Sequence, residues 1–338
     1  MPNVPSYRRF LLSAGAALLL IASAATPTFG EPVSAAPSAA AAAAIKNGVT
    51  IVTRPGAITD YGARALQPYL QAVLKVPVRI QGIPGGGGNT AAQYVYHLPA
   101  TEPVLMMAFL PQLAIGQVIG GGDYNMMRYT PLYGVYGSDT SIYVAKVGGR
   151  IQHYADMLDS KTPVTVGVFG IKSSAGWLST KFLTKINHLK MQPIPFDNGT
   201  AAADAVLGGA IDVAAIPRSL AAPLLAQGRA VAVLEFGPHP LPYLPGVPSI
   251  ASVGKPSEAF TTELGIVGPP GMSADVASLL AGAIAKAVAD PAFRAAAEKA
   301  NFTVVPQTTR EWTAEMARSN AQITAQKSSL LPQTTGKP

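Results

Sequence analysis

Residues 49–89 read VTIVTRPGAITDYGARALQPYLQAVLKVPVRIQGIPGGGGN, and this stretch decides which fold the sequence predicts. The β-rich runs at 48–53 and 77–80 predict two strands. The first strand ends in a loop at 54–60 and the second in a glycine-rich loop at 83–90. Each loop leads into a helical segment, and in the first of these apolar residues recur three and four positions apart. The repeated order of strand, loop and helix is typical of an α/β protein with parallel strands.

The two loops are candidates for binding an anionic ligand. Ligands of open α/β sheets collect at the carboxyl ends of strands, where loops expose backbone N–H groups and helix N-termini carry partial positive charge. Gly85, Gly86, Gly87 and Gly88 allow positive φ angles and a close approach of the backbone to a ligand. From the local residues alone, a flexible turn without a ligand fits equally well. A P-loop is excluded because no Gly-Lys-Ser/Thr follows, and a dinucleotide fingerprint fits poorly because the glycines form one block.

Composition narrows the class of protein further. The 338 residues are enough for two domains, and the hydrophobic content of 49% provides for packed cores. The formal net charge is +7, but the sequence contains no run of Lys and Arg residues, so we expect no nucleic-acid partner. The positive charge predicts a mild attraction for anions. The absence of cysteine excludes disulfides and thiolate metal sites, and the four histidines lack metal-ligand spacing. We therefore expect no metal and no cofactor.

Residues 1–30 have the pattern of a signal peptide. Arg8 and Arg9 precede an apolar segment that ends in small residues, as a cleavage site requires. The paired arginines also fit a twin-arginine export signal, but Phe10 follows them one position early, so the Sec route is favoured. The Ala/Pro-rich residues 31–44 are interpreted as a linker.

A second α/β unit follows the first. Strands predicted at 164–168 and 193–196 again end in loops, at 170–176 and 197–200, and each loop precedes a helix. A strand predicted at 264–268 then returns the chain to the first unit. On this pattern the chain has two domains.

Nine short motifs occur in the order and at the spacing of one known family. They are Pro55-Gly56-x-x-Thr59-Asp60-x-x-x-Arg64, Pro84-Gly85-Gly86-Gly87-Gly88-Asn89, Tyr124 with Tyr129-Thr130-Pro131, Phe196-Asp197-x-Gly199, Gly209-x-x-Asp212, Gly228-Arg229-Ala230-Val231-Ala232-Val233, Leu244-Pro245-Gly246-Val247-Pro248-Ser249, Gly268-Pro269-Pro270-Gly271 and Asp290-Pro291. From about Ile45 to the last helix, the chain resembles the Bug (TctC-type) family, the extracytoplasmic solute receptors of tripartite tricarboxylate transporters.

The resemblance implies an α/β fold of the type II periplasmic binding class, a Venus flytrap of two domains joined by two crossing hinge strands. Residues 45–142 and 266–338 are assigned to domain 1, and residues 143–265 to domain 2. A hinge is expected in the crossing strands near Tyr143 and Ile266.

The resemblance also implies a function in the periplasm. Such a receptor, a monomer, captures a small organic carboxylate between its domains and delivers it to the integral-membrane subunits of a tripartite tricarboxylate-type transporter. Backbone N–H groups and water at the two domain 1 loops hold one carboxylate, and domain 2 loops close on the other end of the ligand. The candidate ligand-binding residues are Arg54, Gly56, Ala57, Thr59, Asp60, Gly85, Gly86, Gly87, Gly88, Asn89, Ser173, Ser174, Trp177, Asp197, Asn198 and Gly199.

Several candidates also have a structural explanation. Asp60 fits either orienting its loop or capping the helix that follows it, and the cap is favoured. Arg64, one turn later, fits either a pair with Asp60 or a contact with the ligand. Arg54 fits either a bidentate clamp on a carboxylate or a solvent-facing position. Asp197 and Asn198 fit either hydroxyl binding or an Asx turn.

The sequence departs from the family pattern in ways that leave the ligand open. Ala57 stands where the family usually has a glycine, and Arg54 stands where it usually has a small or apolar residue. Arg128 stands where the family usually has an acidic residue. Trp177 replaces a frequent histidine, and it fits either stacking on a flat ligand or a core position. Aliphatic di- and tricarboxylates, amino acids and aromatic acids all remain open as ligands.

Two other functions are alternatives to transport. A sensor that presents the same ligand to a signalling partner would need the same loops. A periplasmic enzyme finds little support, because the chain has no Cys nucleophile, no G-x-S-x-G elbow and no obvious pair of catalytic carboxylates. We therefore expect a binding protein that is not an enzyme.

Overall fold

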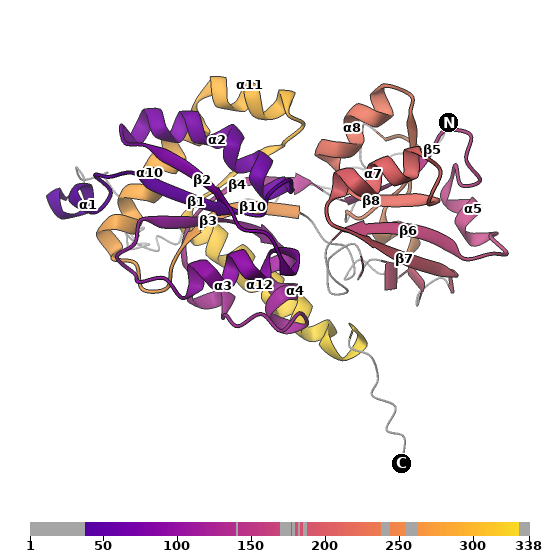
Figure 1. Ribbon diagram of the computed structural model, residues 1–338, viewed down its shortest axis with the longest axis horizontal. Coiled ribbons are helices and arrows are strands. Elements are labelled where there is room, and N and C mark those ends of the chain that lie inside the picture. The colour runs from indigo at the N-terminus through magenta and orange to yellow at the C-terminus, as the bar shows by residue number, and fades with distance from the viewer. Residues whose placement is uncertain are drawn as a thin grey trace, which may run out of the picture. The chain divides into compact units, whose positions relative to one another are not determined.

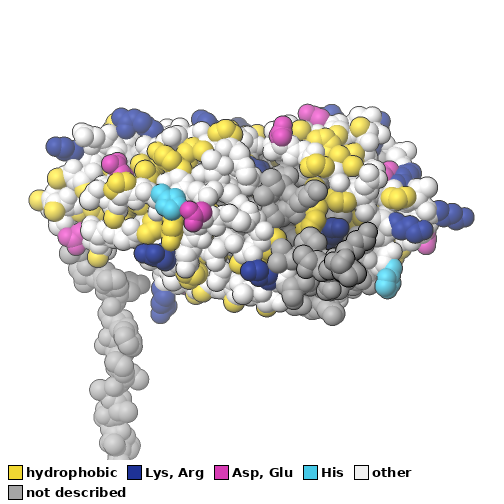
Figure 2. Space-filling view, turned by 60° about the horizontal axis from the view of Figure 1, so that its bottom comes forward, with side chains coloured by type: hydrophobic (Ala, Val, Ile, Leu, Met, Phe, Trp, Pro, Cys, Tyr) yellow, Lys and Arg dark blue, Asp and Glu magenta, His cyan; other side chains and the backbone are white. Residues whose placement is uncertain are grey.

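The computed structural model describes residues 38–139, 141–169, 177, 180–181, 183–184, 188–237, 244–254 and 262–330. Their strands form two sheets with helices packed against them (Figure 1), so the predicted α/β class is confirmed. On the face shown in Figure 2, charged side chains are dispersed among hydrophobic and uncharged ones. This dispersal agrees with a charged content of only 13%.

The first sheet contains the two strands that the glycine-rich stretch predicted. Its order is β11-β4-β10-β3-β1-β2. The strands are β1 (Val49–Thr53), β2 (Val78–Gly82), β3 (Val104–Leu110), β4 (Thr130–Asp139), β10 (Thr262–Gly268) and β11 (Val304–Gln307). β1 pairs in parallel with β2 and β3, with Ile51 opposite Ile80 and Leu105, whereas β10 runs antiparallel to β3 and β4. The carboxyl ends of β1, β2 and β3 therefore meet at one edge of the sheet.

Helices cover both faces of this sheet (Figure 1). One face carries α2 (Ile58–Leu74), α10 (Ala274–Ala289) and α11 (Pro291–Lys299), and the other carries α3 (Asn89–Tyr96), α4 (Gln112–Val118) and α12 (Thr309–Leu330). Leu66 and Ile284 lie in the apolar cluster on the first face, and Ile115 and Trp312 in the cluster on the second. Among the described residues no single helix is long and apolar enough to cross a membrane; α10 and α11 pass this test only as a pair bent by 70°.

The linker interpretation of residues 31–44 is wrong for its last part. Helix α1 (Ala39–Ala44) is capped by Ser38, whose Oγ accepts a hydrogen bond from the Ala41 backbone N–H. Ala41 is buried, and Ser38 Oγ donates to Asp275 Oδ2 of α10 at 3.0 Å. Alanine has the highest helix propensity, and α10 supplies the packing partner that the sequence did not reveal. Residues 1–37, with the predicted signal peptide, lie outside the described residues.

The second sheet has the order β7-β6-β8-β5-β9. Its strands are β5 (Ser141–Lys146), β6 (Val164–Phe169), β7 (Met191–Phe196), β8 (Val213–Pro217) and β9 (Ala230–Glu235). The helices in this part of the chain include α5 (Tyr154–Leu158), α7 (Gly199–Leu207), α8 (Arg218–Ala226) and α9 (Ile250–Val253). β6 is parallel to β7 and β8, which agrees with the second α/β unit expected from the sequence. β5 runs antiparallel to β8 and β9.

The chain passes from one sheet to the other twice. β4 of the first sheet ends at Asp139, and β5 of the second begins at Ser141; the return leads into β10. Tyr143 and Ile266, the positions chosen for a hinge, lie within β5 and β10 and are fully buried. The domain boundaries and the crossing hinge strands stay predictions.

The start of β8 is tied to β6 by a charged network around Asp212. The Arg150 guanidinium donates to both carboxylate oxygens of Asp212 at 2.6 Å. The backbone N–H and the hydroxyl of Thr165 each donate to Asp212 Oδ2 at 2.7 Å. Burial acts to raise the pKa of Asp212, but the hydrogen bonds from Arg150 and Thr165 outweigh it and hold that pKa below its ordinary value of 3.8.

We expect Asp212→Asn to lower the free energy of unfolding at pH 7 by about 1–2 kcal/mol, because hydrogen bonds to a charged acceptor are lost. A depressed carboxyl pKa contributes stability above the unfolded-state value, and this is lost as pH falls through the folded-state value. The difference between the two proteins should therefore begin to shrink as the pH falls below 3.8. Urea unfolding from pH 7 to pH 3 measures it, with Asp204→Asn at an exposed position of α7 as the control. A difference that is the same at pH 3 as at pH 7 would contradict the role given to the charge.

Candidate functional site

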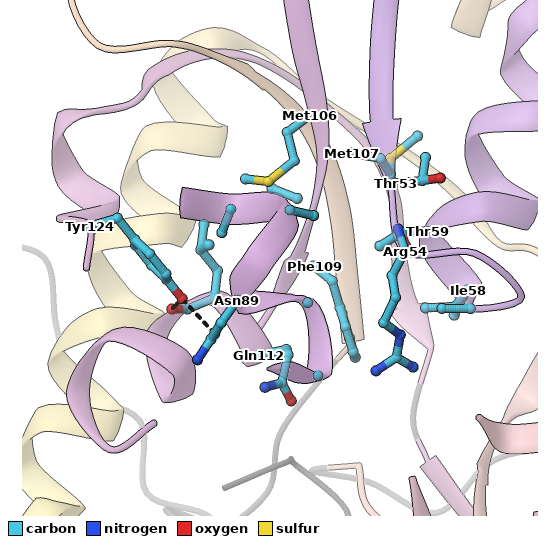
Figure 3. Close-up of a pocket in the computed structure, with 17 residues that line it drawn as sticks. Thr53, Arg54, Ile58, Thr59, Asn89, Met106, Met107, Phe109, Gln112 and Tyr124 are labelled. Atoms are coloured by element: carbon cyan, nitrogen blue, oxygen red, sulfur yellow. Dashed lines mark hydrogen bonds between the residues drawn. The ribbon is translucent and has the colours of Figure 1, made fainter. Parts of the chain in front are cut away.

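A pocket opens at the edge of the first sheet where β1 and β3 end (Figure 3). The volume of the pocket is about 520 Å³, and part of this volume is open to solvent. Figure 3 shows Arg54 and Ile58 on one side, Asn89 and Tyr124 on the other, and Phe109 between them. The lining residues are Thr53, Arg54, Ala57, Ile58, Thr59, Gly87, Gly88, Asn89, Ala91, Ala92, Met106, Met107, Ala108, Phe109, Gln112, Leu113 and Tyr124.

Three helices begin at this pocket. The first residues of α2, α3 and α4 are Ile58, Asn89 and Gln112, and all three line it. Their N-cap residues, Ala57, Gly88 and Pro111, make no side-chain cap hydrogen bond. The N-terminal N–H groups of a helix have no partner within the helix, and the positive end of the helix dipole lies beside them. The pocket therefore gathers backbone donors suited to an anion.

Glycine is required in the second loop for a backbone reason. Gly85, Gly86, Gly87 and Gly88 have φ angles of 108°, 57°, 65° and 110°, a region that side chains with a Cβ rarely adopt. Gly87 and Gly88 line the pocket, whereas Gly85 and Gly86 shape the turn before it. The loop that sequence analysis identified is thus at the pocket.

The prediction that Asp60 caps α2 is wrong, because the N-cap is Ala57 and Asp60 lies inside the first turn. The Asp60 carboxylate accepts hydrogen bonds from Thr53 Oγ1 at 2.9 Å and from Arg64 Nε at 3.1 Å. The predicted pair with Arg64 is confirmed. Asp60 is buried but does not line the pocket; it links α2 to the end of β1.

Asn89 is held in place by a buried contact with Tyr124. The Tyr124 hydroxyl lies 3.2 Å from Asn89 Oδ1 and 2.9 Å from the Leu113 carbonyl oxygen, and Asn89 Nδ2 donates to the Gly120 carbonyl at 3.4 Å. Gly116 of α4 leaves the space for this contact, since a Cβ there would overlap Asn89 Oδ1 and the Tyr124 hydroxyl. The side chain of Asn89 is therefore part of the pocket wall.

Arg54 lies in the pocket lining and is half-buried. Its backbone N–H donates to Thr59 Oγ1 at 3.3 Å, which fixes the loop after β1. Figure 3 shows its guanidinium beside Phe109, toward the same side of the pocket as Gln112. Burial lowers the pKa of Arg54 from its ordinary value, but an arginine stays charged at neutral pH.

The described residues of the second α/β unit reach this region at two points. Trp177 is partly buried and packs against both the apolar cluster that contains Leu113 and the one that contains Leu183. Of the two interpretations of Trp177, stacking on a flat ligand and a core position, the structure favours the core position. Asn198 is the N-cap of α7 and accepts from the Ala201 backbone N–H at 2.9 Å. The Cβ position of Gly56 lies 3.9 Å from Asn198 Nδ2.

Gly199 and Asp197 do not line the pocket. Gly199 is the buried first residue of α7, and Asp197 is exposed. Ser173 and Ser174 lie outside the described residues.

Comparison with known proteins assigns the chain to a family. The family described as the tripartite tricarboxylate transporter family receptor, TctC, matches residues 145–327, more than half of the 338. The chain belongs to this family. No match was found among curated proteins.

Solved structures with the same fold as this receptor include periplasmic binding proteins. The periplasmic binding protein BugD is 16% identical, covers 83% of this chain and 97% of its own, and has a TM-score of 0.74. MatC from Rhodopseudomonas palustris with bound malate is 20% identical, covers 83% and 98%, and has a TM-score of 0.73. An R. palustris protein with adipate is 17% identical, covers 83% and 96%, and has a TM-score of 0.74. At these identities the likeness shows the fold, which is that of a two-domain periplasmic binding protein.

The part of the receptor's pocket that comes from β3 and α4 was not among the predicted site residues. Met106, Met107 and Phe109 lie in β3, and Gln112 and Leu113 begin α4. The strand was followed by Pro111 and then a helix, the same layout as in the two glycine loops, and this was the available signal. The parallel pairing of β3 with β1 brings these residues to the site.

Proposed function

We propose that this receptor captures a small organic carboxylate in the pocket, within the cleft between its domains, and delivers it to the membrane subunits of a tripartite tricarboxylate-type transporter. The observation that carries the proposal is the convergence of three helix starts on one pocket. Helix N-termini bind carboxylates well because unpaired N–H groups and the helix dipole act on the same charge. The solved relatives named for bound malate and adipate are consistent with a carboxylate class.

The backbone is the main support for the carboxylate in this proposal. Ile58 and Thr59 supply backbone N–H groups at the start of α2, and Arg54 adds a positive charge beside them. Charge-assisted hydrogen bonds of this kind are about twice as strong as neutral ones. The N–H groups of Gly88 and Asn89 donate to the Gly85 and Gly86 carbonyl oxygens and so shape the second loop. Loops of the second domain, with Asn198 near Gly56, close on the rest of the ligand.

The proposal includes export and a soluble state. Residues 1–30 direct the chain to the periplasm through the Sec route and are removed, and the mature receptor is a monomer. It binds its ligand without transforming it. Domains 1 and 2 close about the strands that connect the two sheets.

Binding should appear as thermal stabilisation by one or two acids of a panel of succinate, malate, citrate, adipate, glutamate, benzoate and hexanoate. A ligand that binds only the native state adds about 2.7 kcal/mol at a hundredfold excess over Kd. Differential scanning fluorimetry measures the shift, and proton NMR of the recovered acid tests for turnover. The matched controls are the neutral amides adipamide and benzamide, which should have no effect. If no acid raises the Tm, or if the amides raise it equally, the proposed function is wrong.

A further inference from the structure

We propose that two buried tyrosines, Tyr129 and Tyr136, are positioning residues of the pocket, which hold the N-terminal parts of α3 and α2 in place from opposite faces of the first sheet. This inference rests on the proposed function and adds to it the residues that fix the helix starts. Neither tyrosine lines the pocket, so each acts through the helix that it contacts.

Tyr136 holds α2 from β4. Its hydroxyl donates to the Gly62 carbonyl oxygen at 2.8 Å. Ile58 and Thr59 of the same helix line the pocket, and the N–H groups at these first two positions have no partner within the helix. Gly62 lets the ring approach this closely, because a Cβ there would lie 3.0 Å from Tyr136 Cε2. α2 is therefore fixed to the sheet one turn after the two residues that offer donors to an anion.

Tyr129, which immediately precedes β4, makes the same kind of contact with α3 on the other face of the sheet. Its hydroxyl donates to the Ala92 carbonyl oxygen at 2.6 Å, and Ala92 lines the pocket. Tyr124 adds a second hydroxyl to this helix, at Asn89 Oδ1. The segment 129–136 thus holds both helices that follow the two predicted loops.

The surroundings of the two rings keep both hydroxyls in place. The Tyr136 ring centroid lies 4.7 Å from that of Phe302 and 5.9 Å from that of Phe293, and the Tyr129 centroid lies 5.4 Å from that of Tyr96. Aromatic pairs at such separations attract one another. Burial raises the pKa of both hydroxyls, so each keeps its proton and donates at neutral pH. A binding site keeps its geometry when residues around it are locked by packing and hydrogen bonds.

Tyr→Phe variants test the inference because they remove each hydroxyl and keep the ring. The probe for isothermal titration is the acid of the panel above, from succinate to hexanoate, that raises the Tm of the unmodified receptor most. Tyr129→Phe and Tyr136→Phe should each weaken binding at least about threefold. The double variant should weaken it about tenfold, because contacts on separate helices contribute independently. A variant that is merely less stable stays folded well below its Tm, so a lower Tm alone would leave the Kd unchanged.

Tyr69→Phe is the matched control. The Tyr69 hydroxyl also bonds a helix carbonyl, that of Ala292 at 3.1 Å, but from the second half of α2, and its loss should leave the Kd unchanged. An unchanged Kd in Tyr129→Phe or Tyr136→Phe, or an equal loss of affinity in Tyr69→Phe, would overturn the inference and leave the proposed function standing. If no acid of the panel binds the unmodified receptor, the proposed function and the inference both fail.

Gly62→Ala tests the α2 contact from the helix side. The added Cβ presses on the Tyr136 ring, so it should displace the hydroxyl from the Gly62 carbonyl oxygen and weaken binding of the same acid. In a double-mutant cycle the loss caused by Gly62→Ala should be at least about twofold smaller in Tyr136→Phe, where no hydroxyl is left to displace. Equal losses in the two backgrounds, with circular dichroism confirming the fold of each variant, would contradict the positioning role of Tyr136.

Discussion

Replacing Gly116 by alanine is expected to destabilise the receptor and to weaken carboxylate binding at least about tenfold. The added Cβ would overlap Asn89 Oδ1 and the Tyr124 hydroxyl, so the buried contact between these side chains must break. Overpacking costs ~1–3 kcal/mol and an unmade buried hydrogen bond ~1–3 kcal/mol. Because Asn89 begins α3 at the pocket, the backbone donors of that helix should move with it.

The control for this change is another helical glycine with free space around it. Gly282 in α10 has no atom within 4 Å of a built Cβ, and it is exposed. Gly282→Ala should raise the free energy of unfolding by ~0.5–1 kcal/mol, because alanine favours the helix, and should leave binding unchanged. Thermal melts measure the stability of both variants, and titrations measure their affinity for the carboxylate. If Gly116→Ala binds like the unmodified receptor, the wall formed by Asn89 and Tyr124 does not support the site.

Gly87→Val is expected to weaken carboxylate binding by at least about a hundredfold, since two hydrogen bonds to a charged acceptor at ~1.5–3 kcal/mol each would be lost. Gly87 has φ 65°, and a β-branched residue is a conformational outlier there. The loop should therefore rearrange and turn its N–H groups away from the carboxylate. Isothermal titration with the acid that gives the largest thermal shift measures the loss.

The effect of backbone strain has to be separated from the loss of the backbone N–H donors around the glycine-rich loop at residues 83–90, which we call the backbone cradle. Gly228 has φ 64° in the turn after α8, with no atom within 4 Å of a built Cβ. Gly228→Val therefore introduces the same backbone strain, of order 1–3 kcal/mol, outside the pocket lining. It should lower the Tm without changing the affinity. Equal losses of affinity in the two variants would show that general destabilisation, rather than the cradle, explains the effect of Gly87→Val.

The sequence predicted those parts of the fold that depend on local patterns. β-Rich runs and glycine blocks located β1, β2 and the loop before α3. Ser273 caps α10, and Thr308 and Glu311 form a reciprocal capping box at the start of α12, both through hydrogen bonds between residues close in the sequence. These features rest on interactions between residues close in the chain, so a pattern of residue types is enough to identify them.

Features that depend on distant contacts were missed or misread. Helix α1 needed the partner α10 to become packed, and β11 is a short edge strand that contains Pro306 and pairs with β4. Asp60 resembled a cap because Asp is favoured at that position, but it lies inside α2 and accepts a hydrogen bond from Thr53 at the end of β1. The contribution of α4 to the pocket likewise depends on the pairing of β3 with β1. None of these partners is adjacent in the sequence.

The most direct test of the backbone cradle compares Gly87→Val with Arg54→Ala in one titration experiment. Arg54→Ala removes one charge-assisted partner and should weaken binding about tenfold, because one hydrogen bond to a charged group contributes ~1.5–3 kcal/mol and partial exposure reduces it. Gly87→Val should weaken binding about tenfold more than Arg54→Ala does. Circular dichroism must show that both variants are folded. If Arg54→Ala abolishes binding while Gly87→Val binds like the unmodified receptor, a side-chain clamp holds the anion and the backbone cradle is wrong.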